Sequence, residues 1–225
     1  MDYGNAFVYM FSSEDWIKKL ILAVAMSLIP ALGIFVVVGW ALDVLRNLRE
    51  GKPDPLPEWT GDEFARWLGR GMGLTVTVFT FLLPVIAVFI IIWSCGMIGT
   101  ATVFSESDAG GTVALCMVCV YILMYFVAGL GALVAFVRYA STDRIDVGLE
   151  YSKNFQLVST NIATLLIIVV LMLLMWIVAG IAGILTLGIL YLALPVYSIL
   201  VLANFGAQLS QQPDFSGERD IVSEM

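Results

Sequence analysis

The chain alternates between long apolar runs and short clusters of charged residues. Four stretches contain no Asp, Glu, Lys or Arg, at 20–42, 71–105, 109–137 and 154–213. One helical crossing of a bilayer core needs about 20 apolar residues, so the last of these stretches is long enough for two crossings. The pattern therefore predicts an all-α, polytopic membrane helix bundle.

Turn residues divide these runs into six apolar segments. The segments lie at about 18–30, 31–48, 73–104, 112–139, 160–184 and 188–208. We expect them to pair as three helical hairpins within a single transmembrane domain that spans 1–208. The polar tail 209–225 is expected to be disordered, because it holds too few apolar residues to form a core.

An amphipathic helix that lies along the membrane surface is expected to precede each hairpin. At about 60–71, Arg66 and Arg70 lie on one helical face, whereas Phe64 and Trp67 lie on the other. A polar face combined with an aromatic face is typical of interfacial helices. We therefore expect the charged face to contact water and the aromatic face to contact the acyl boundary.

The aromatic residues of this region, Trp59, Phe64 and Trp67, are expected to lie at the headgroup level, which aromatic rings favour. The alternative is a solvated helix packed against a protein neighbour. A second interfacial helix is expected at about 143–158, and a shorter stretch beginning at Ser12 precedes the first hairpin.

The first hairpin is short and is broken by Pro30 and Gly33, which leaves two interpretations open. If 20–42 crosses the membrane once, Lys18 and Lys19 lie on the external side. If the segment folds back near Pro30 as a re-entrant hairpin, all eleven basic residues lie on one side. We favour the fold-back, although each half is shorter than a usual crossing.

The distribution of basic residues predicts the orientation. Loops rich in Lys and Arg stay in the cytoplasm. The loops 46–70 and 138–153 hold eight of the eleven basic residues, whereas 105–111 and 185–188 hold none. We therefore expect the first pair of loops, and both termini, to be cytoplasmic.

Composition agrees with a membrane protein and excludes several functions. Apolar residues make up 60% of the chain and charged residues 13%, against about 45–50% and 25% in soluble domains. The net charge of −7 argues against nucleic acid, which requires a basic surface. Without histidine a Ser-His-Asp triad cannot form, and Cys116-x-x-Cys119 lacks a second ligand pair for zinc. We expect no cofactor, no metal and no catalytic activity.

Several short motifs occur in the first half of the chain: Gly39-Trp40, Arg46, Gly51 and Leu56-Pro57-Glu58-Trp59. Together with Arg138-Tyr139-Ala140 and Phe155, they make residues 10–208 resemble the prokaryotic membrane family known as domain of unknown function 4013. Trp40 stands where the family pattern has Tyr. The resemblance implies the plasma membrane of a bacterium or archaeon, and it implies no activity.

Four polar residues, three near the membrane boundaries and one deep in the last apolar segment, are candidates for structural, lipid or partner contacts. Asp43 and Arg46 share a helical face; they form either an exposed ion pair or a polar anchor that locks the loop 56–59 beneath the bundle. Arg138 is a lone cation at the end of the fourth segment, placed to bind lipid phosphate or the loop. Asn204 is the best candidate for an interhelical hydrogen bond.

These observations favour a non-catalytic integral membrane protein, either an accessory subunit or a membrane organiser. Its expected partners are membrane lipids and either another membrane protein or a second copy. A passive channel or carrier for a small neutral or apolar solute is the alternative, because Pro30, Pro84 and Pro195 could unwind helices inside the membrane. No charged residue lies deep in the apolar segments, which argues against a proton-coupled pump.

Overall fold

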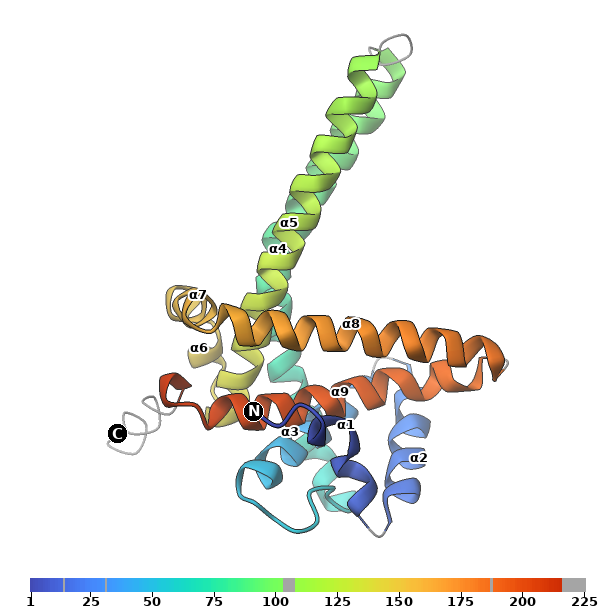
Figure 1. Cartoon of the computed structure of the whole chain (residues 1–225), viewed down its shortest axis with the longest axis vertical. Coiled ribbons are helices and arrows are strands. Elements are labelled where there is room, and N and C mark those ends of the chain that lie inside the picture. The colour runs from blue at the N-terminus through green and yellow to red at the C-terminus, as the bar shows by residue number, and fades with distance from the viewer. Residues whose placement is uncertain (14, 31, 103–107, 187, 216–225) are drawn as a thin grey trace.

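Two long helical hairpins extend from a common base in different directions (Figure 1). The computed structural model describes residues 1–215 apart from 14, 31, 103–107 and 187, and its elements are α-helices and short 3₁₀ helices. One hairpin pairs α4 (Phe64–Thr102) with α5 (Asp108–Thr142), and the other pairs α8 (Ile162–Leu185) with α9 (Ile189–Ser210). In Figure 1 the α8–α9 hairpin lies across the direction of the α4–α5 hairpin.

The remaining elements surround the N-terminal part of α4, the C-terminal part of α5 and α9, and form the base. They are α1 (Asn5–Val8), the 3₁₀ helix η1 (Tyr9–Ser12), α2 (Trp16–Ser27), α3 (Gly33–Arg49), the 3₁₀ helix η2 (Gly61–Glu63), α6 (Ile145–Gly148) and α7 (Tyr151–Thr160). Helix α3 is central, since it packs against α4 and α9 and buries most of its apolar side chains.

Four of the described helices are long and apolar enough to cross a membrane. The candidate spans are Gly61–Ile91, Val118–Thr142, Ile162–Ile184 and Leu190–Ser210. They correspond to the last four of the six predicted segments. The first two segments form α2 and α3, with 12 and 17 residues. At 1.5 Å per residue these helices are about 18 and 26 Å long, shorter than a hydrocarbon core of about 30 Å.

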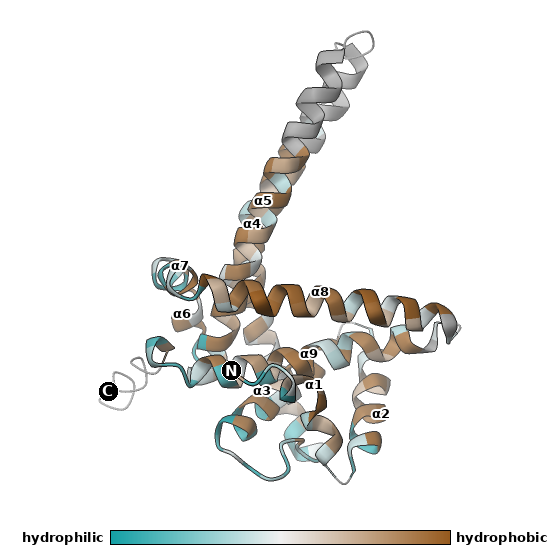
Figure 2. Ribbon diagram, viewed as in Figure 1, coloured by the Kyte–Doolittle hydropathy of each residue, from teal (hydrophilic) through white to brown (hydrophobic). Residues whose placement is uncertain are grey.

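Helix α8 is apolar on every side. Figure 2 shows hydrophobic residues along almost its whole length, and large side chains such as Leu173, Val178, Ile181 and Ile184 are exposed. A helix that lies flat on a membrane surface needs a polar face toward water, and α8 has none. It therefore requires hydrocarbon or another apolar neighbour around it.

The separate interfacial helix predicted at 60–71 does not form. Residues Gly61–Glu63 form η2, and everything from Phe64 onward is the first part of the continuous helix α4. The glycines at 69, 71 and 73 all lie inside this helix. Two of them admit close neighbours.

The stretch 143–158 also differs from one amphipathic helix. It divides into α6 and α7, which are separated at Leu149 and Glu150. On α7 the predicted aromatic face, with Tyr151 and Phe155, meets Phe81 of α4. The face therefore packs partly against protein.

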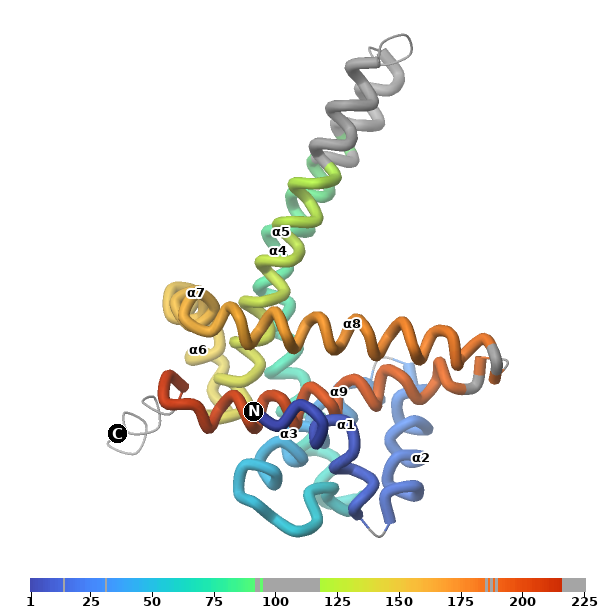
Figure 3. The backbone as a smooth tube through the Cα atoms, in the orientation of Figure 1, coloured from blue at the N-terminus to red at the C-terminus, as the bar shows by residue number. Residues whose placement is uncertain are grey.

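Both ends of the described chain pack against the base. Figure 3 shows the N-terminal segment close to α9. The hydroxyl of Tyr9 donates to the carbonyl of Leu200 at 3.0 Å, and that of Tyr197 donates to the carbonyl of Phe7 at 3.0 Å. At the other end Phe215 is buried against α5 and α8. The predicted disordered tail thus begins too early at 209, because its first residues are packed; 216–225 lie outside the described residues.

Two glycines bring α3 and α4 into backbone contact. A Cβ at Gly39 would lie 1.9 Å from the carbonyl oxygen of Trp67, and one at Gly71 would lie 1.8 Å from the carbonyl oxygen of Phe35. Because backbone atoms cannot move aside as a side chain can, only glycine fits at these two positions. The close approach sets the crossing of α3 over α4.

We expect Gly39→Ala and Gly71→Ala each to lower the free energy of unfolding by about 3 kcal/mol, the upper end for overpacked cores. Gly69→Ala is the matched control in α4, because a Cβ there meets open space, and it should be neutral or slightly stabilising. Thermal unfolding in detergent measures all three. Equal effects at Gly69 and Gly71 would contradict the proposed role of the contact.

Candidate functional site

A buried carboxylate, that of Asp43 in α3, is the centre of the base. Asp43 is 6% exposed. One of its oxygens accepts hydrogen bonds from the guanidinium of Arg66 and from the indole nitrogen of Trp67, the latter at 2.7 Å. Its other oxygen accepts from Arg70. All three donors lie on α4, so this carboxylate joins α3 to α4.

Arg70 extends the network to the end of α5. Its guanidinium also donates to Asp143, at 2.6 Å from Nη2 and 2.9 Å from Nε. Arg46 of α3 pairs with the same carboxylate. Asp143 has a φ of 54°, in the left-handed region that is uncommon for residues other than glycine. This conformation ends α5 and directs the chain toward α6.

The sequence prediction paired Asp43 only with Arg46, which shares its helical face, whereas the structure pairs each of them with a partner outside α3. Arg70, expected to face water, is largely buried between two carboxylates. Arg66 does keep an exposed guanidinium, which also pairs with Glu63. These cross-helix pairs left no periodic signal within any single segment.

Trp67 was predicted to contact the acyl boundary, but it is buried inside the protein. It is 1% exposed, and its ring lies 5.1 Å from that of Trp59, which in turn lies 5.2 Å from Trp40. The half-buried Trp59 thus closes the outer side of this aromatic cluster. Phe64 is exposed, and of the three aromatic residues it alone could still contact lipid as predicted.

The loop between α3 and α4 is held beneath the base, although by other residues than Asp43 and Arg46. The buried ammonium of Lys19 donates to Asp54 at 2.7 Å and to the carbonyl of Leu56 at 2.6 Å. Trp40 donates its indole N–H to the carbonyl of Pro57, and Asn47 donates to that of Pro55. Lys19 belongs to α2, whereas Trp40 and Asn47 belong to α3. The loop between α3 and α4 therefore links α2 to α3 through these contacts.

Arg138 is a second buried charge. It is 2% exposed, and its guanidinium donates to Asn154 and Glu150, both at 2.7 Å. Asn154 is itself fully buried and donates to the carbonyl of Gly148. Arg138 thus holds α6 and α7 against α5. The alternative role, binding of lipid phosphate, would require an exposed guanidinium.

The guanidinium of Arg138, followed by the ammonium of Lys153, holds the pKa of the Glu150 carboxyl below its usual value. The lowered pKa means that the folded state favours the ionised carboxylate. Its stabilisation is complete above the ordinary glutamate pKa of about 4.3. It is lost as the pH falls through the lower pKa of the folded state.

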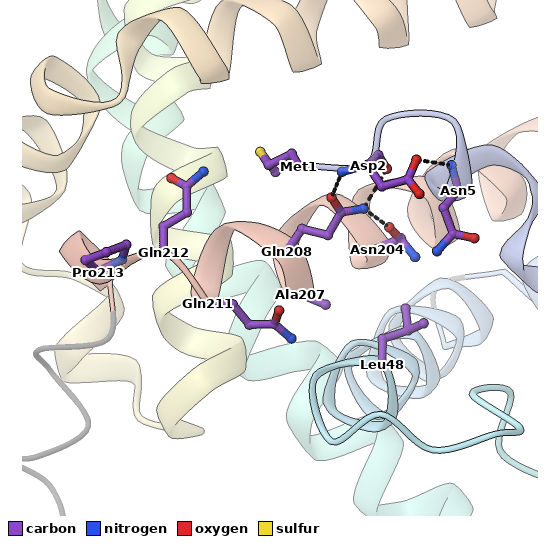
Figure 4. A pocket seen from close by; sticks show the side chains of 10 residues that line it. All are labelled: Met1, Asp2, Asn5, Leu48, Asn204, Ala207, Gln208, Gln211, Gln212 and Pro213. Carbon is purple, nitrogen blue, oxygen red and sulfur yellow. Dashed lines mark hydrogen bonds between the residues drawn. The ribbon is translucent and has the colours of Figure 1, made fainter.

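A cavity of about 540 Å³, with several polar residues in its walls, opens at the C-terminal end of α9 (Figure 4). Its walls come from the N-terminal segment, α3 and α9, and include Asn5, Asn204 and Gln208. Asn204 was expected to bond to another helix, but its carbonyl oxygen accepts from Gln208 of the same helix at 2.6 Å. Gln208 makes the contact between segments instead, since it bonds to the backbone of Asp2.

Long apolar helices above an ion-paired base define the chain as a helical, multi-pass membrane protein. The particular family follows from comparison with known proteins. Residues 22–188 match the family described as Protein of unknown function (DUF4013), and the chain belongs to that family. No curated protein and no solved structure matches it.

We expect Asp43→Asn to lower the free energy of unfolding by about 3 kcal/mol, because breaking a buried ion pair leaves uncompensated charge inside the protein. Asp62→Asn is the matched control: it removes the same charge from an exposed position near the start of α4 and should change stability by less than about 0.5 kcal/mol. Chemical or thermal unfolding of the detergent-purified protein checks both. An Asp43→Asn variant as stable as the control would show that the network is dispensable for stability.

The Glu150 contact predicts a dependence of stability on pH. Near neutral pH, Glu150→Gln should unfold at a lower temperature than the unchanged protein. The difference should shrink as the pH falls below about 4.3, because the carboxyl of the unfolded chain then takes up a proton that the folded carboxylate still resists, and it should vanish below the folded-state pKa. Melting curves across this range test the sign. The exposed Glu58 supplies the control Glu58→Gln, for which we expect little difference at any pH.

Proposed function

We propose that this protein is a non-catalytic component of a prokaryotic plasma membrane, either an accessory subunit or an organiser of the surrounding bilayer. The supporting observation is the contrast between the base and the hairpins. In the base, the charged groups of Asp43, Arg70, Asp143 and Arg138 are engaged in pairs with one another or with neighbouring side chains. Such groups support structure, whereas reactive sites keep a titratable group free to meet substrate.

The hairpins support the second half of the proposal. They diverge from the base (Figure 1), and between them lies a groove of about 500 Å³ lined by apolar residues such as Tyr125 and Phe136 of α5 and Ile168 and Met172 of α8. Transmembrane helices tilt by up to about 40°, so two hairpins that splay in opposite directions can both cross one bilayer. Lipid or a partner helix would then fill the space between them.

We further propose that the base lies in the cytoplasm with both termini, and that α2 and α3 form a re-entrant hairpin. The basic loops 46–70 and 138–153 meet in the base through Arg70, Arg46 and Asp143. The N-terminal segment lies beside the C-terminal end of α9. Helices α2 and α3 are too short for ordinary crossings, which favours a fold-back at the turn between them.

Cysteine accessibility tests this orientation in a variant in which the three native cysteines are replaced by alanine. With a membrane-impermeant maleimide, Thr186→Cys should label in intact cells, because the turn between α8 and α9 would be external. Lys52→Cys and Arg144→Cys should label only after permeabilisation. Labelling of position 52 or 144 in intact cells would reject the cytoplasmic base.

Photocrosslinking tests the function. A photoreactive amino acid at the exposed Ile177 of α8 should give adducts in living cells, whereas one at Glu58 in the base serves as the control surface. A discrete protein adduct at position 177 supports an accessory subunit, and lipid adducts alone support a bilayer organiser. Equal adducts at both positions would contradict a role specific to the hairpins.

A passive carrier is the second candidate, supported by the prolines inside α4 and α9. Reconstituted vesicles distinguish the two. Carrier activity predicts saturable flux of a small neutral or apolar solute, and an accessory or organising role predicts flux equal to that of empty vesicles.

A further inference from the structure

Pro84 interrupts the backbone hydrogen bonds of α4 at the point where α7 contacts it. In an α-helix the N–H of each residue bonds to the carbonyl four residues earlier, and proline has no N–H. Pro84 therefore leaves the carbonyl of Thr80 without its helical partner. The hydroxyl of Tyr151 donates to that same carbonyl at 3.2 Å. Tyr151 is the first residue of α7, so α7 supplies the donor that Pro84 lacks.

Aromatic rings pack beside this bond. Phe81, the residue after Thr80, is 3% exposed. Its ring lies 4.6 Å from that of Tyr151 and 6.4 Å from that of Phe155. On the opposite side Gly131 of α5 makes room for it, since a Cβ there would lie 3.0 Å from the Phe81 ring.

Helix α4 carries two further features that favour bending, both on the N-terminal side of Pro84. The hydroxyls of Thr77 and Thr80 bond to carbonyls one turn earlier in the same helix, a pattern that bends helices. Beside the bond a groove of about 340 Å³, lined in part by Pro84 and Tyr151, separates α7 from the upper part of the hairpin. The groove leaves space into which the hairpin can move.

We infer that Pro84 and Tyr151 form a clasp that sets the angle of the α4–α5 hairpin to the base. With the bond made, α4 is held to α7, which Arg138 holds to α5 through Asn154. With the bond broken, α4 pivots at Pro84, while the ion pairs of Asp43 keep its lower end in place. The clasp controls how widely the two hairpins diverge. This inference does not depend on which proposed function is correct.

Spin-label distances in the full-length protein, reconstituted in lipid nanodiscs, test the clasp. One label occupies the exposed native Cys119 of α5, and the other occupies Ile177→Cys on α8, with Cys95 and Cys116 replaced by alanine. Tyr151→Phe removes only the hydroxyl. It should raise the population outside the main distance peak about fivefold, which corresponds to the ~1 kcal/mol of one net hydrogen bond.

A double-mutant cycle separates the clasp from general loosening. Pro84→Ala restores an N–H for the Thr80 carbonyl, so adding Tyr151→Phe to it should cause no further broadening. Tyr197→Phe is the matched control, because it removes a tyrosine-to-carbonyl bond elsewhere, and it should leave the distances unchanged. The inference fails if Tyr151→Phe does not broaden the distance distribution. It also fails if Tyr151→Phe broadens the distribution as much in the Pro84→Ala background as in the unchanged protein.

Discussion

The arrangement of the base depends on the buried carboxylate of Asp43. A charge removed from water costs several kcal/mol unless it is paired and hydrogen-bonded. Helix α3 can therefore occupy the centre of the protein only where α4 brings Arg66, Trp67 and Arg70 to that carboxylate. Arg70 also pairs with Asp143 at the end of α5, so one buried charge network relates three helices.

Glycine makes this pairing possible. The guanidinium of Arg70 reaches Asp43 because α3 and α4 approach to backbone contact at Gly39 and Gly71. Close approach by small residues is a common means of packing helices in membranes, where the hydrophobic effect does not draw helices together. In this protein the close contact and the charge pairs lie on the same pair of helices, and each reinforces the other.

The hairpins follow a different physical rule. They carry few groups that could bond to one another across the gap, and their exposed apolar side chains suit a hydrocarbon surrounding. The base is held by charge pairs, which demand specific partners, whereas the hairpins are held mainly by packing along their own length. A difference in rigidity between these two parts follows, and the proline inside α4 lies where one gives way to the other.

Reasoning from the sequence succeeded for some elements and failed for others, for identifiable reasons. The bounds of α8 and α9 lie within two residues of the predicted segments, because uninterrupted apolar runs leave one solution. The predicted separation of a surface helix at 60–71 from the span at 73–104 was wrong, since a charged first part of a long helix looks the same in a sequence as a separate interfacial helix. The N-terminal segment on α9 was missed, because four to eight residues carry too little periodicity to reveal a helix or its neighbour.

By itself, the sequence determined that this is an all-α membrane chain of its family. It predicted six apolar segments, of which the structure makes four long enough to cross a membrane. The hydrophobicity and the length of each segment can be read directly along the chain, without knowledge of how the segments pack. Only the tertiary structure decided that Trp67 is buried, that Arg70 bridges two carboxylates and that Tyr151 completes the bonding of α4. Periodicity shows which residues share a face of one helix. Which residue of a distant helix meets that face depends on how the helices cross in space.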